Sequence, residues 1–153
     1  MTNPQLYVKA NNTFQPNSST AITITTGSLY IPANSILYGN ANTFNVTGNW
    51  YCAGTFTPGT SSVVFSGAAL QTAVTNTQNF YNLTINNTAT DANRKVIVTD
   101  RLNVSNAINI AGGSLDLATN NVNATIGGDF TIQNGGGLIK AATGTMLFNG
   151  NTT

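Results

Sequence analysis

The sequence predicts an all-β protein, and within that class a parallel, right-handed β-solenoid. Three observations support this prediction: a composition that disfavours helices, short stretches in which apolar and polar residues alternate, and blocks of sequence that recur along the chain. Asn and Thr together account for 49 of the 153 residues, and both form helices poorly. Because 41% of the residues are hydrophobic, the composition is not typical of a disordered chain.

The alternating stretches are the expected strands, since a period of two places every second side chain on a buried face. Most of them stop at Gly, Asn or Asp, which favour turns. About twelve to fourteen such strands fit in the chain. The clearest are, in chain order, residues 21–31, 82–88, 95–104, 108–117 and 128–134.

Internal repeats favour a solenoid over other β folds. Three blocks recur in the same order at offsets of 80 to 86 residues: 22–31 with 108–117, 46–50 with 126–130, and 59–67 with 143–150. We therefore expect residues 21–153 to form a solenoid of just under two repeats of about 83 residues. Residues 1–20 fit the pattern poorly and are expected to be an N-terminal cap or an extended arm.

The alternative fold is an antiparallel β-sandwich or jelly roll, which also needs many short strands. Tight antiparallel hairpins favour Asn-Gly or Asp-Gly turns. The chain has no Asp-Gly, and Asn-Gly occurs only at 134–135 and 149–150. In the solenoid, Ile24, Leu29, Leu115 and Leu117 are expected to point inward and to stack on the adjacent turns.

Three stretches resemble repeats of very large bacterial cell-surface proteins that are rich in Thr, Asn and Gly. They are GNWYCAGTFTPGTSSVVFSG at 48–67, QNFYNLTINN at 78–87, and the run from Val96 to Ile132. Those proteins are parallel β-helix or adhesin-like chains, and the resemblance extends over residues 22–150. It implies an extracellular or cell-surface location and a structural or adhesive role.

Composition also limits the classes of function. Five Lys and Arg against four Asp give a net charge of +1, too little to bind nucleic acid electrostatically. No apolar run approaches the ~18 residues that insert into a membrane. There is no His, Cys52 is the only cysteine, and the four Asp are expected at solvated or corner positions. We therefore expect a non-enzymatic protein without a metal or cofactor.

Two groups of residues are candidates for binding a ligand. Tyr30 and Tyr51 are expected to face outward, because Tyr30 aligns with Asp116, and exposed tyrosines can stack on sugar rings. The segment 91–101 holds five of the nine charges and offers Arg94, Lys95 and Arg101 to an anionic ligand. These residues support the alternative function, a carbohydrate-binding β-helix module that recognises surface glycans.

A further candidate is an edge for self-association at the C-terminal end. The apolar residues Met146, Leu147 and Phe148 are followed by no proline, charge or helix that would block pairing with another strand. The expected partners are copies of the same chain, as in a filament, or neighbouring repeats of a longer chain.

Overall fold

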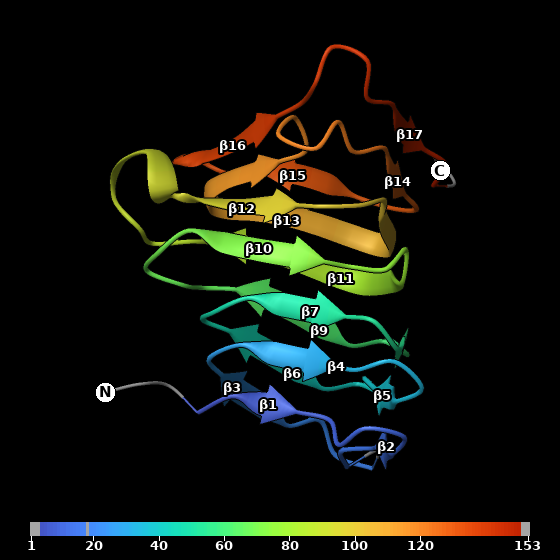
Figure 1. Ribbon diagram of the computed structural model, residues 1–153. Helices are drawn as coiled ribbons and strands as arrows, with labels where there is room; N and C mark the ends of the chain where they lie inside the picture. Colours follow the sequence, from blue (N-terminus) through green and yellow to red (C-terminus); the bar gives the residue numbers. More distant parts are fainter. Residues whose placement is uncertain (1–3, 18, 151–153) are drawn as a thin grey trace.

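The computed structural model describes residues 4–17 and 19–150 and is a parallel β-solenoid of about six turns (Figure 1). Every strand pairing among these residues is parallel, which confirms the solenoid and rules out the antiparallel sandwich. The only helix in the described part of the chain is η1, a 3-10 helix at Asp91–Asn93. No helix there is long and apolar enough to span a membrane.

Each turn has three faces, named here in chain order. Face 1 consists of β1 (Leu6–Tyr7), β4 (Leu29–Ile31), β7 (Trp50–Cys52), β10 (Gln71–Val74), β12 (Lys95–Val98), the end of β13 (Leu102–Asp116) and β16 (Gly136–Ile139). Face 2 consists of β2 (Thr13–Phe14), β5 (Ile36–Tyr38), β8 (Thr55–Thr57), the first residues of β11 (Asn79–Asn86) and of β13, β14 (Ala124–Ile126) and β17 (Met146–Phe148). Face 3 consists of β3 (Thr23–Thr26), β6 (Thr43–Val46), β9 (Ser62–Phe65), the rest of β11, the middle of β13 and β15 (Phe130–Ile132).

The turns differ in length, although their strands stay in register. On face 1 the step from one turn to the next varies from 19 residues (Val96 to Leu115) to 25 residues (Gln71 to Val96). The extra residues lie at the corners. One such corner falls within β11, where the register against β13 shifts by one residue between Phe80 and Asn82. Insertions at corners therefore leave the stacked strands aligned.

The interior is a set of apolar columns, each contributed by every second residue of a face. Leu29, Leu115 and Leu117 are fully buried as expected, and Ile24 packs against the core from the first turns. Trp50 lies at the centre of an aromatic group with Phe56 and Phe80, at ring-centroid distances of 4.9 and 5.2 Å. These columns provide most of the buried apolar surface.

Polar residues close the corners between faces. Several asparagines there have positive φ, including Asn34, Asn40 and Asn121, a conformation that Asn tolerates better than most residues. At another corner Gly54 packs against the carbonyl oxygens of Pro32 and Ser35, which a Cβ atom would meet. Asn and Gly thus serve the corners, where positive φ and close backbone approaches occur.

The two members of a pair of recurring blocks do not always lie on the same face of the solenoid. Both members of the first pair, 22–31 and 108–117, run from face 3 to face 1. In the other two pairs Val46 and Phe65 lie on face 3, whereas the residues aligned with them, Ile126 and Phe148, lie on face 2. The unit that recurs in space is therefore the single turn, and residues 4–17 already form the first one through β1 and β2.

Replacing Leu115 with Asp should destabilise the fold by more than about 3 kcal/mol, because the carboxylate would lie between Val96 and Leu138 without a partner. The matched control is Thr25→Asp, which places the same group on the exposed side of β3 and should cost less than about 1 kcal/mol. Urea unfolding measures both. Equal stability of the two variants would contradict the inward position of Leu115.

Candidate functional site

Three tyrosines form a ladder on the outer side of face 1. Tyr7, Tyr30 and Tyr51 occupy the same column in three successive turns. Their rings are stacked, with centroids 5.1 and 4.5 Å apart and planes 4° from parallel. The structure thus brings Tyr30 and Tyr51 together and adds Tyr7, whose position one turn before Tyr30 could have indicated it.

The stacking restricts what this tyrosine ladder can bind. The faces of Tyr30 are covered by its neighbours, and its partial burial between them raises its pKa above the usual 10, an effect to which Tyr51 and Tyr7 contribute. Sugar rings stack on aromatic faces. Val74 follows Tyr51 in the same column, whereas Tyr7, 58% exposed, begins the ladder, so the outer face of Tyr7 is the more accessible one.

The charged segment 91–101 does not form one binding surface. Arg94 donates from Nε to the carbonyl of Asn87 (3.3 Å), and Lys95 is paired with Asp116 (2.8 Å). Arg101 lies beyond the far end of β12 and donates to Thr125 Oγ1 (3.3 Å). The three basic side chains therefore bind different partners: the carbonyl of Asn87, the carboxylate of Asp116 and the hydroxyl of Thr125.

Asp116 lies at the end of β13, beside the corner at 118–121, and its side chain is buried. It is 1% exposed and accepts hydrogen bonds from Lys95 and from the backbone and hydroxyl of Thr119. Burial alone would raise the pKa of this carboxyl, but the bonds from Lys95 and Thr119 outweigh it and hold the pKa below the usual 3.8. The pair fastens β12 to the end of β13, a structural role.

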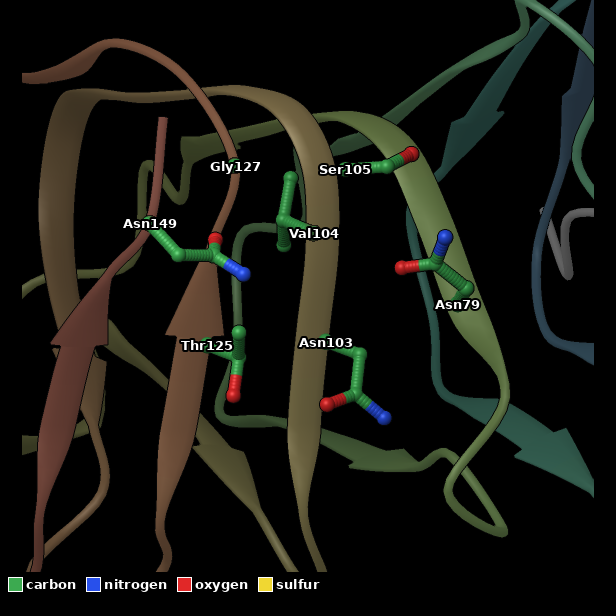
Figure 2. A pocket seen from close by; sticks show the side chains of 7 residues that line it. All are labelled: Asn79, Asn103, Val104, Ser105, Thr125, Gly127 and Asn149. Atoms are coloured by element: carbon green, nitrogen blue, oxygen red, sulfur yellow. The ribbon is translucent and has the colours of Figure 1, made fainter. Parts of the chain in front are cut away.

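A polar groove crosses the outer side of face 2 and its corner with face 3 (Figure 2). Its volume is about 440 Å³. Polar side chains from successive turns point into it, and the residues that line it are Asn79, Asn103, Val104, Ser105, Thr125, Gly127 and Asn149. A second hollow of about 190 Å³ shares Thr125 and adds Arg101.

The groove offers hydrogen-bonding groups of both kinds. With the oxygen and nitrogen of its amide exchanged relative to Figure 2, Asn79 donates to the carbonyl of Asn103 (3.0 Å) and accepts from Ser105 Oγ (3.2 Å), so it bonds within the wall. The Asn103 amide donates to Thr77 O (2.9 Å). Among the described residues, the oxygen of this amide and the side-chain amide of Asn149 have no hydrogen-bond partner and face the groove. The amides and hydroxyls that line the groove are groups that can hydrogen-bond a polar ligand.

The last turn exposes side chains from the interior columns. Phe148 lies in line with the fully buried Ile126 and is 55% exposed, and Ile132 lies in line with Ile110 and is 45% exposed. In the described chain β15, β16 and β17 are each paired on one side only. We call this surface the C-terminal end; it combines unpaired backbone groups with the inward residues Phe130, Ile132, Leu138, Met146 and Phe148.

Within the C-terminal end, the three residues expected to form an edge have different orientations. Met146 and Phe148 point inward, toward the apolar columns, whereas Leu147 is in line with Thr125 and faces outward beside the groove. The sequence predicted β17 as an exposed strand but did not predict the exposed inward residues of β15 and β16. Their exposure depends on their position in the last described turn.

Cys52 does not provide a reactive group. Its side chain is buried on β7, and burial raises the pKa of the thiol to about 11, so that the thiolate is scarce at neutral pH. Among residues 4–17 and 19–150, no group of His, Cys, Asp or Glu is arranged to hold a metal ion.

Replacing Asp116 with Asn should lower stability by about 1–3 kcal/mol at pH 7, since it removes a charge-assisted bond and leaves Lys95 unpaired. The pKa of Asp116 is lowered in the folded protein, so its charged form stabilises the fold above pH ~3.8, and this contribution is lost as the pH falls through the folded-state pKa. The difference from the wild type should therefore shrink below pH ~3.8 in thermal melts. Asp129→Asn, at an exposed position, is the control; an undiminished difference at pH 2 would refute the assignment.

The chain was also compared with known proteins. No family model, curated protein or solved structure matches it.

Proposed function

We propose that this protein is a non-enzymatic structural or adhesive element of an extracellular or cell-surface assembly, and that it self-associates through the C-terminal end. The observation that carries the proposal is the exposure there of an interior apolar surface next to unpaired strands. Such edges pair readily with further strands. The extracellular location rests on the resemblance of residues 22–150 to cell-surface repeats.

The energetics favour association at this surface. Fully burying a side chain the size of Leu or Phe contributes about 1.5–3 kcal/mol, and Ile132 and Phe148 are both about half exposed. Backbone groups of β15, β16 and β17 would add main-chain hydrogen bonds at the same time. Lys140 is the one charged residue of β16 and the described chain after it, so little electrostatic repulsion opposes the contact.

The rest of the solenoid suits a load-bearing or spacing element. Its turns are joined by parallel ladders that continue along faces 1 and 3, whereas on face 2 the sheet β2-β5-β8 is separate from the strands of the later turns. Its corners are closed by buried polar side chains such as Gln71, which accepts from Gly67 N and donates to Val46 O. A rigid rod of this kind holds whatever is attached at its ends at a fixed separation.

A second candidate function is binding of a neutral glycan, and the polar groove favours it over the tyrosine ladder. Sugar hydroxyls both donate and accept hydrogen bonds, as do the amide of Asn149 and the hydroxyl of Thr125. The volume of about 440 Å³ falls in the range of small-ligand sites. Arg101 is the only charged residue that lines either hollow in the described structure.

Replacing Phe148 with Lys should abolish concentration-dependent self-association, because it places a charge in the apolar row of the C-terminal end. Sedimentation velocity from low to high micromolar concentration measures this. Thr57→Lys, on the outer side of β8 away from both ends, is the matched control and should associate like the wild type. A wild-type chain that stays monomeric throughout the range would refute the proposal.

Replacing Thr125 with Val should weaken glycan binding about 2- to 10-fold if the groove is the site, because it removes one hydrogen-bonding hydroxyl. Wild-type ligands would first be identified on an array of neutral glycans, and their affinities then measured by titration calorimetry. Thr131→Val, on β15 outside the groove, is the control. Unchanged affinity of the Thr125→Val variant would exclude this groove.

A further inference from the structure

We infer that the partner of the C-terminal end is the first turn of a second copy, so that copies stack head to tail and continue the solenoid. This inference rests on the proposed self-association and specifies its partner and register. It follows from the first turn, which we call the N-terminal end and which carries the matching set of unpaired strands.

The N-terminal end is open in the same way as the C-terminal end. Within the described chain β1, β2 and β3 each pair on one side only. Their inward residues Leu6, Phe14 and Ile24 lie in line with the fully buried Leu29, Leu37 and Phe44 but are themselves partly exposed, Phe14 to 36%. Both ends therefore expose interior columns.

The two ends present their faces in a compatible arrangement. The C-terminal end offers β16 on face 1, β17 on face 2 and β15 on face 3, and the N-terminal end offers β1, β2 and β3 on the same three faces. Head-to-tail stacking keeps all strands in one direction, so the new pairs would be parallel, as every described pair is. No strand has to reverse or change face.

The columns that meet are apolar on two faces. On face 3 the column that starts at Ile24 runs through Phe44, Val63, Leu83 and Ile108 to Phe130. On face 2 strand pairing links Phe14, Leu37 and Phe56, and separately Phe80, Val104, Ile126 and Phe148. The two sets meet through the rings of Phe56 and Phe80, whose centroids are 6.0 Å apart. Phe130 and Phe148 of one copy would thus cover Ile24 and Phe14 of the next.

On face 1 strand pairing links Leu6 through Leu29, Trp50 and Ala73 to Val98. Ile97, Asp116 and Ile139 are paired in register, so the residues that follow them, Val98, Leu117 and Lys140, continue the same column. Lys140 would therefore lie over Leu6 of the next copy. Lys140 follows β16 and is exposed, with its ammonium bonded to the carbonyl of Ala141 (2.9 Å). Its methylene stem can cover Leu6 while the charge stays in solvent. Face 1 therefore tolerates the contact, and faces 2 and 3 provide its apolar centre.

The competing arrangement joins two C-terminal ends about a twofold axis. It would require antiparallel pairing, which occurs nowhere among the described strands, and it would leave Phe14 and Ile24 uncovered in both copies. A twofold contact closes at a dimer, whereas a head-to-tail contact is open-ended and produces a filament. The two arrangements therefore differ in what a mixture of blocked copies can form.

The test uses one variant blocked at each end. Phe148→Lys blocks the C-terminal end and Phe14→Lys blocks the N-terminal end; each should weaken association about 10-fold or more. Alone, each variant should remain monomeric in sedimentation velocity. An equimolar mixture should form a dimer with one copy of each and nothing longer, because it contains one intact pair of ends. The wild type should form longer species, visible as rods by electron microscopy.

The outcomes separate this inference from the proposed function. Dimerisation of Phe14→Lys by itself would show tail-to-tail pairing and overturn the head-to-tail arrangement while leaving self-association intact. An associating wild type whose variants do not complement each other would also overturn it. A monomeric wild type would overturn both proposals. Circular dichroism confirms that each variant is folded, and Phe14→Ser replaces Phe14→Lys if that variant is not.

Discussion

The constraint on which this structure depends is the parallel, in-register stacking of successive turns. Most strands pair with a strand of the turn before and a strand of the turn after, so a residue such as Phe44 has a partner of the same orientation on each side, Ile24 and Val63. Apolar residues then form continuous inward columns. Outward charges would be stacked a few ångströms apart, which explains why a chain of 153 residues carries only nine.

The features that depend on this periodicity could be predicted from the sequence. Alternation identified Leu29, Leu115 and Leu117 as inward, because a strand fixes the orientation of each residue relative to its neighbour. The outward expectation for Tyr30 had a different basis, its alignment with Asp116, and Asp116 itself is buried. The faces occupied by the recurring blocks could not be predicted. They depend on corner lengths, which vary without changing the apolar pattern, and so Phe65 and Phe148 align in sequence but lie on different faces.

The candidate sites were less predictable, because they combine residues one turn apart. Tyr7 joins Tyr30 only through a step of 23 residues, and the polar groove uses Asn and Thr residues that resemble the other Asn and Thr of the chain. The arrangement of the charges in segment 91–101 could not be predicted either. The charges cluster in sequence, but strand β12 separates Arg94 from Arg101, and the partner of Lys95 is Asp116, in the next turn.

The same stacking that stabilises the middle of the solenoid leaves its ends exposed. A residue in the middle of a column has an apolar neighbour in the turn before and in the turn after. The last residue of a column has only the first of these, so its other apolar side is exposed. Phe148 and Ile126 are both apolar residues at inward positions of an alternating strand, yet Phe148 is 55% exposed and Ile126 is fully buried. In the proposed head-to-tail arrangement, the last described turn of one copy meets the first described turn of the next. The apolar columns and the parallel ladders would then continue across the contact in the direction they have within the chain.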